Sequence, residues 1–193
     1  SELVSAIVLL VLVTDPFGNV PLAVAAMRGV PRERRLRVIA RECLIAYALL
    51  LVFLFGGKAF LALMHLSEAS LSIAGGVILF LIALRMVFAH PDGVFGDTPV
   101  AEPFIVPLAI PAIAGPSALA TVMLMASRTP DALPSLVVAV SVAMLVTVVV
   151  LAAAGRVHRV IGERGVLAME RLMGLVLTAL AVEMLLSGIR MFT

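Results

Sequence analysis

The chain has 193 residues, of which 63% are hydrophobic and only 13% are charged, with no tryptophan and a single tyrosine. A soluble domain of this length would need more polar residues to cover its surface, so the composition indicates an integral membrane protein. The net charge of +2 does not indicate a nucleic-acid partner, because the arginines lie at the ends of apolar segments and form no basic face with interleaved aromatic residues. Cys43 is the only cysteine and the three histidines are scattered, so we expect no disulfide, no metal site and no other cofactor.

A helix needs about 20 apolar residues to cross a bilayer, and this rule predicts an all-α membrane protein with six transmembrane helices. They occupy residues 3–27, 38–55, 69–89, 103–126, 134–154 and 172–192. We do not expect the first segment to be a cleavable signal peptide, because its first residues are not basic and an Asp-Pro pair interrupts its middle.

The positions of the arginines predict the orientation in the membrane, because positively charged residues are retained on the cytoplasmic side. Ten of the 14 Lys and Arg residues lie between the first and second segments, at the start of the second (Arg41), or between the fifth and sixth, whereas Lys58, Arg128 and Arg190 lie on the opposite side. We therefore expect both termini on the outer side of the cytoplasmic membrane and the linker at 90–101 on the cytoplasmic side.

The chain also resembles itself. The third and sixth segments match when Gly76 is aligned with Gly174, an offset of 98, and Asp15-Pro16 faces Gly115-Pro116 at an offset of 100. Two matches in nearly the same register indicate a duplication within a single transmembrane domain, with repeat one at 1–90, the linker at 90–101 and repeat two at 102–193. Because each repeat has three segments, the second enters the membrane from the opposite face. The two repeats are then inverted, as in alternating-access transporters.

Prolines interrupt the first and fourth segments, which are therefore expected to be discontinuous. A proline frees backbone groups that are tolerated in a membrane only where they line a cavity, so the two interruptions should meet at mid-membrane. Each should start a half-helix, with Asp15 and Gly115 as N-caps and a proline at the first helical position. Prolines 99, 103, 107 and 111, spaced four apart, should shape a rigid half-helix before the second interruption.

These half-helix ends predict a site for a small zwitterion. Asp15 can cap its own helix, whereas Gly115 has no side chain, which leaves the amides near Ser117, Ala118 and Leu119 for a carboxylate. Asp15 and Asn19 would receive the ammonium group. The neighbouring residues are small, and they leave room only for a small substrate; they are Gly18, Ala114, Gly115, Ser117 and Ala118.

Purely structural roles are the alternative for several of these residues. Asp15 could merely cap a kinked helix, with its charge satisfied locally. Arg85 and Glu183 occupy equivalent positions in the two repeats, but an inverted repeat places them near opposite faces, where each reaches water or a polar neighbour. The small residues four apart, Ser72 with Gly76 and Gly174 with Thr178, favour helix packing over a site.

Three stretches carry a resemblance to a known family: "TDPFGNVPLA" at 14–23, "IAGGVILFLIALRM" at 73–86 and "AIAGPSALAT" at 112–121. With the six-segment layout they resemble the MarC family of bacterial and archaeal inner-membrane proteins over nearly the whole chain. The resemblance implies a six-helix inverted-repeat fold and transport of small neutral amino acids, namely glycine, alanine or serine. It also implies a substrate site formed by Asp15, Pro16, Gly18, Asn19, Gly115, Pro116 and Ser117.

Together these observations favour a secondary transporter of small neutral amino acids in the bacterial or archaeal cytoplasmic membrane. An ion channel or ion-only carrier is the alternative. An enzyme is not expected, because an intramembrane aspartyl protease needs two facing aspartates and Asp15 is the only aspartate inside a predicted segment. The expected partners are the amino acid, membrane lipid and a coupling ion, either a proton or sodium; formation of a homo-oligomer stays open.

Overall fold

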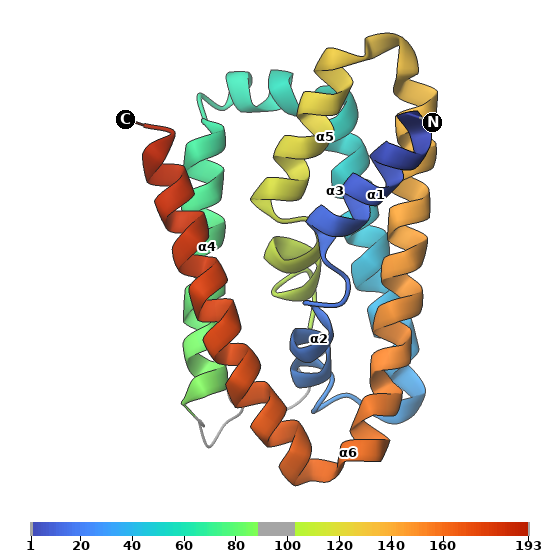
Figure 1. Cartoon of the computed structure of the whole chain (residues 1–193), viewed down its shortest axis with the longest axis vertical. Helices are drawn as coiled ribbons and strands as arrows, with labels where there is room; N and C mark the ends of the chain where they lie inside the picture. The colour runs from blue at the N-terminus through green and yellow to red at the C-terminus, as the bar shows by residue number, and fades with distance from the viewer. Residues whose placement is uncertain (1, 89–102, 193) are drawn as a thin grey trace.

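The computed structural model describes residues 2–88 and 103–192, and in these ranges the chain is all-helical, as predicted (Figure 1). The linker predicted at 90–101 lies outside the described residues. The helices in chain order are α1 (Glu2–Thr14), α2 (Val20–Ala26), α3 (Arg32–Leu63), α4 (Glu68–Val87), the π-helix η1 (Leu108–Ile113), α5 (Pro116–Arg128), the short 3₁₀-helix η2 (Pro130–Ala132) and α6 (Leu133–Arg190).

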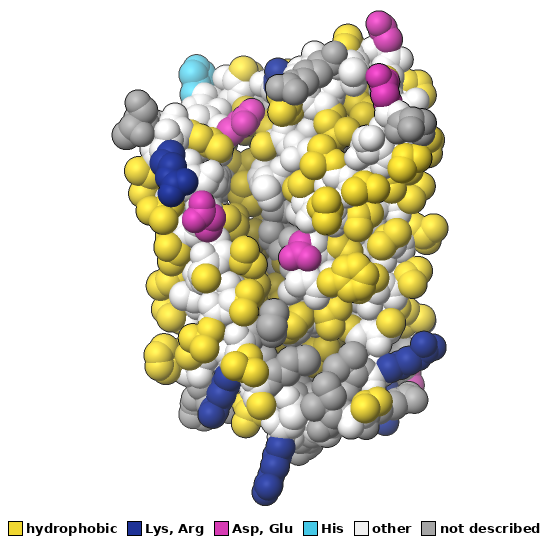
Figure 2. All heavy atoms as spheres, in the orientation of Figure 1, with side chains coloured by type: hydrophobic (Ala, Val, Ile, Leu, Met, Phe, Trp, Pro, Cys, Tyr) yellow, Lys and Arg dark blue, Asp and Glu magenta, His cyan; other side chains and the backbone are white. Residues whose placement is uncertain are grey.

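The surface of the described chain suits a lipid environment. Three of its helical segments are long and apolar enough to cross a membrane, Arg32–Leu63, Glu68–Val87 and Pro130–Arg156, and α1 is a shorter apolar helix. Large apolar side chains also point outward: Leu12 is 70% exposed and Leu145 is 63% exposed. Figure 2 shows such side chains along the length of one face. Helices that expose apolar side chains and satisfy their own backbone groups are what a bilayer requires.

Both predicted interruptions are present. Helix α1 ends at Thr14 and α2 begins only at Val20, and η1 ends at Ile113 before α5 begins at Pro116. Of the half-helix predicted before the second interruption, only the short π-helix η1 forms, however. Residues 103–107 are irregular, with Ile105 at φ 64° and a cis peptide bond before Pro107, and η1 itself has a second cis peptide bond before Pro111. Each proline lacks a backbone N–H, so a regular helical hydrogen-bond ladder cannot run through this stretch.

Helix α6 consists of two arms that run in opposite directions (Figure 1). The chain turns at Gly162, whose φ of 71° and ψ of 174° suit a residue without a Cβ. The loop that the sequence predicted between the fifth and sixth segments is therefore largely helical. Likewise α3 extends beyond the predicted 38–55 at both ends. Counting apolar residues finds the part of a helix inside the bilayer core and misses its polar ends.

The described helices pack as two groups. One core cluster joins α1, α3, η1, α5 and the first arm of α6, and the second joins α4 to the second arm of α6; α2 contributes buried residues to both. In the second group a Cβ added at Gly76 would lie 3.0 Å from the Ala181 carbonyl oxygen, and one at Gly174 would lie 3.0 Å from the Val87 nitrogen. These close backbone approaches confirm that Gly76 and Gly174 are packing residues.

Candidate functional site

The first interruption is a turn organised by Asp15. Asp15 has φ 41°, a left-handed conformation that aspartate tolerates better than most residues. Its Oδ1 accepts a hydrogen bond from the Gly18 amide at 3.0 Å. A Cβ at Gly18 would lie only 2.0 Å from Asp15 Oδ2, so glycine at this position makes room for the carboxylate. The prediction that Asp15 is the N-cap of α2 is wrong, because Asn19 is the residue that precedes α2. Asp15 instead caps the turn at 16–19, since its carbonyl oxygen also accepts the Asn19 amide at 3.1 Å.

Asn19 joins the two interruptions. Its Nδ2 donates to the Thr14 carbonyl oxygen at 2.9 Å and to the Ala112 carbonyl oxygen at 3.2 Å. The first carbonyl ends α1, and the second lies in η1 just before the other interruption. Asn19 is buried, and both N–H bonds of its side-chain amide are used in this way. Toward an ammonium group only its Oδ1 is then an acceptor.

The second interruption leaves the start of α5 open. Gly115 is the N-cap residue, as predicted, with Pro116 at the first helical position and no side-chain cap. A Cβ at Gly115 would lie 2.5 Å from the Pro111 carbonyl oxygen, which excludes any larger residue without a shift of the backbone. The Leu119 amide donates to the Gly115 carbonyl at 3.0 Å and is not available to a ligand, contrary to the prediction. The amides of Ser117 and Ala118 belong to the first turn, where helices have no internal acceptor.

A cavity of about 350 Å³ lies beside the two interruptions, between them and the pair formed by α4 and the second arm of α6. Figure 2 shows a hollow between these two parts of the molecule, with carboxylate side chains on both sides of it. Of the predicted site residues, Asp15, Asn19, Gly115, Pro116 and Ser117 line this cavity. The other four lie beside these without lining it, and three of them are buried; the four are Pro16, Gly18, Ala114 and Ala118.

The cavity also has lining residues that sequence reasoning did not assign to the site. Glu68, Ser72, Glu183 and Ser187 come from α4 and α6. Ser72 Oγ donates to the Met184 carbonyl at 2.8 Å and so ties these two helices together. Glu183 is 63% exposed and lies 3.7 Å from Arg190, in agreement with the prediction of water or a polar neighbour. The only sequence signal for these residues was the repeat, which matches the third segment to the sixth. It does not show which side chains of these two segments face the interruptions.

The arrangement offers a carboxylate, carbonyl oxygens and open helix amides around one space. A carboxylate with carbonyl oxygens binds cations, and the start of a helix binds anions. One wall of the cavity thus carries both kinds of group, Asp15 from the first interruption and the first turn of α5 from the second. A ligand with both charges would satisfy both.

Comparison with known proteins agrees with the helical, apolar structure. The model of the family described as "MarC family integral membrane protein" matches residues 1–193. The UPF0056 inner membrane protein YhgN of Escherichia coli (strain K12) is 46% identical over 193 residues, covering 100% of this chain and 98% of the relative. A UPF0056 membrane protein of Buchnera aphidicola subsp. Schizaphis graminum is 42% identical, covering 98% and 97%. One of Pyrococcus abyssi is 31% identical, covering 92% and 89%.

No solved structure matches this chain. The family match and the E. coli relative nevertheless extend over the full length of the chain. The chain belongs to the MarC family of integral membrane proteins.

Proposed function

We propose that this protein is a secondary transporter that carries small neutral amino acids, such as glycine, alanine and serine, by alternating access. The proposal rests on one observation: two interrupted helices meet beside a single cavity, are joined there by Asn19, and present Asp15 and Ser117 to it. Discontinuous helices with facing ends are how many secondary transporters bind substrate and coupling ions.

In this proposal each charged end of the amino acid has its own partner. The ammonium group binds the Asp15 carboxylate and Asn19 Oδ1. The substrate carboxylate binds the amides of Ser117 and Ala118, at the start of α5, where the helix dipole adds to the attraction. The whole cavity, at about 350 Å³, is larger than glycine requires. The size limit therefore has to act locally, where Ala112, Gly115 and Pro116 form the wall.

Alternating access requires two arrangements of the helices, and an inverted repeat supplies them. We propose that six segments cross the membrane as two inverted repeats, 1–90 and 102–193, related by the matched interruptions. The contacts of Gly76 and Gly174 support this, since Gly76 lies against Leu185 and Gly174 lies against Val87, and the same offset of 98 relates Val87 to Leu185. Figure 1 also has the start of α1 and the end of α6 at the same end of the molecule, as three segments per repeat require.

We further propose that the protein lies in the cytoplasmic membrane with both termini outside. The E. coli relative is named as an inner membrane protein, and Lys and Arg side chains gather at the end of the molecule away from the termini (Figure 2). Cysteines introduced at Glu2 and Phe192 should react with an impermeant thiol reagent in intact cells. Reaction at only one of the two positions would contradict the inverted repeat.

Uptake and efflux of labelled glycine in proteoliposomes, with proton and sodium gradients imposed separately, tests the transport proposal. Saturable glycine flux that alanine and serine inhibit, and that one gradient drives, is the expected result. Ion flux that is fast, non-saturable and indifferent to amino acids would instead identify the alternative, a channel or ion-only carrier. Pocket size has its own test: glycine, alanine or serine should raise the unfolding temperature by binding the folded state, and leucine or tryptophan should not.

A further inference from the structure

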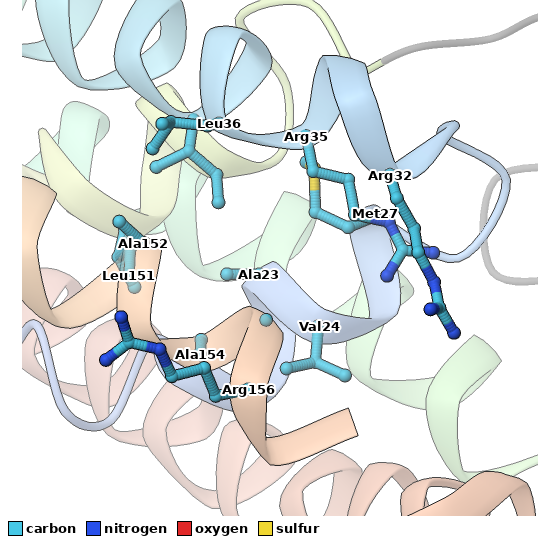
Figure 3. Close-up of a pocket in the computed structure, with 12 residues that line it drawn as sticks. Ala23, Val24, Met27, Arg32, Arg35, Leu36, Leu151, Ala152, Ala154 and Arg156 are labelled. Carbon is cyan, nitrogen blue, oxygen red and sulfur yellow. The ribbon is translucent and has the colours of Figure 1, made fainter. Parts of the chain in front are cut away.

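A second cavity, of about 340 Å³, lies near the other end of the molecule, where α3 begins and α6 approaches its turn. Three arginines line it in the part of the chain that the structure describes: Arg32 and Arg35 from the first turn of α3, and Arg156 from the first arm of α6. In Figure 3, Arg32 and Arg35 lie on one side of the cavity and Arg156 on the other, with Ala23 and Val24 of α2 between them. The cavity is thus positively charged on two opposite walls.

No acidic side chain of the described residues is paired with these arginines. Elsewhere Arg41 lies 3.2 Å from Glu42 and Arg190 lies 3.7 Å from Glu183. Among the described residues, no carboxylate pairs with the three arginines of the cavity, and no Asp or Glu is one of its lining residues. Arg35 donates from Nε to the Val30 carbonyl at 2.9 Å, which holds its guanidinium in place and leaves the terminal NH₂ groups for a ligand. A cleft lined by one sign of charge concentrates counter-ions.

The remaining lining residues are mostly apolar. Leu36 follows Arg32 by four residues, on the same face of α3, and is 60% exposed. Leu151 and Val24 add buried apolar surface. A small free anion gains nothing from such walls, whereas a molecule with a phosphate and hydrocarbon chains satisfies both the arginines and the leucines. Arginine is also the side chain best suited to bind phosphate oxygens in pairs.

We propose that this cavity binds the phosphate group of an anionic phospholipid, with the acyl chains lying along Leu36. Basic pockets between membrane helices are a known way to hold such head groups. Because the cavity is bounded by α2, α3 and the first arm of α6, the bound lipid links these three helices. The site is separate from the proposed amino-acid site, so its test does not depend on transport.

The test is the unfolding temperature of the detergent-solubilised full chain, titrated with short-chain phosphatidylglycerol, with short-chain phosphatidylcholine and with inorganic phosphate. Phosphatidylglycerol should raise the unfolding temperature and saturate. Arg32→Gln and Arg156→Gln should each raise the half-saturating concentration by about fivefold, as expected for one arginine near an anionic head group. Arg37→Gln is the matched control, because Arg37 is exposed on the same helix and does not line the cavity; it should leave the titration unchanged.

Four results would overturn the proposal. One is no shift with phosphatidylglycerol, and another is an equal shift with phosphatidylcholine, which would leave only an acyl-chain effect. Equal weakening by Arg37→Gln would mean that diffuse surface charge is responsible. Saturation by inorganic phosphate, with no additional shift from the lipid, would make the ligand a free phosphate. Both cavity variants change exposed side chains, so their unfolding temperatures without lipid should match that of the wild type.

Discussion

Replacing Asn19 with alanine removes two hydrogen bonds at the point where the interrupted helices meet. The Thr14 and Ala112 carbonyls lose donors at 2.9 and 3.2 Å, and the first of these bonds is buried. A buried polar group left without a partner costs about 1–3 kcal/mol, and a partly buried bond contributes about 0.5–1.5 kcal/mol. Asn19→Ala should therefore lower the free energy of unfolding by roughly 2–4 kcal/mol. Asn19→Asp should cost at least as much, because it sets carboxylate oxygens against two carbonyl oxygens.

The measurement is reversible unfolding in mixed micelles of a mild detergent and a denaturing one, followed by the loss of helical signal. The matched control is Thr121→Val, which removes a hydrogen bond of 2.7 Å to the Ser117 carbonyl on an exposed face of α5. That bond lies within one helix and joins nothing else, so the control should stay within about 0.5 kcal/mol of the wild type. If Asn19→Ala costs no more than Thr121→Val, then Asn19 does not hold the interruptions together and the site geometry derived from it is wrong.

Three further substitutions test the rest of the site and its support. Asp15→Asn should keep the fold, because an asparagine side-chain oxygen also accepts a hydrogen bond from the Gly18 amide. It should reduce glycine transport by about tenfold or more, because the ammonium group loses its charged partner. Normal transport would mean that Asp15 only stabilises the turn. Gly115→Ala should lower the free energy of unfolding by about 1–3 kcal/mol, because the new Cβ would lie 2.5 Å from the Pro111 carbonyl oxygen. The control is Gly56→Ala in the same assay, which should be neutral or stabilising, because no described atom beyond its own stretch of helix lies within 4 Å of a Cβ at Gly56. Ser72→Ala should lower the free energy of unfolding by about 0.6–1.7 kcal/mol, because the bond to the Met184 carbonyl joins α4 to α6; no loss would mean that close glycine packing alone holds this pair.

The sequence predicted the helical class, the family and the places where helices break, because each depends on local chemistry. Apolar runs have to be helices in lipid, and proline cannot continue a hydrogen-bond ladder. Gly115 as an N-cap followed from the same kind of reasoning. The Gly76 and Gly174 contacts were also predictable, since small residues at matched spacing allow backbones to approach.

The details of the turn at Asp15 were not predictable in this way. An Asp-Pro pair is compatible with a helix that starts at the proline, and it is equally compatible with a turn that the Asp carboxylate closes by accepting the amide of a later glycine. The structure adopts the second, so α2 begins four residues later than the expected first helical position, Pro16. The double role of Asn19 depends on a carbonyl 93 residues away in the chain, and no local pattern carries that information. The arginine cavity was not predicted either. In the sequence, the positive-inside rule was sufficient to explain why arginines lie at 28–41 and 156–171, and it does not show that three of them face one cavity.

Helix α2 is where these observations converge. It has seven residues, too few for a stable helix on its own, so it owes its structure to its surroundings. Residues 21–26 are all buried, against both core clusters. The cavity at the two interruptions reaches the N-cap residue of α2, Asn19, and the arginine cavity reaches Ala23, Val24 and the C-cap residue, Met27. In the proposed transport cycle α2, about two helical turns long, follows Asp15 toward the other side of the membrane. Asn19 holds the start of this short helix to the rest of the protein by two side-chain hydrogen bonds. We therefore expect a change at Asn19 to alter both the proposed substrate site and the position of α2, which follows that site in the chain.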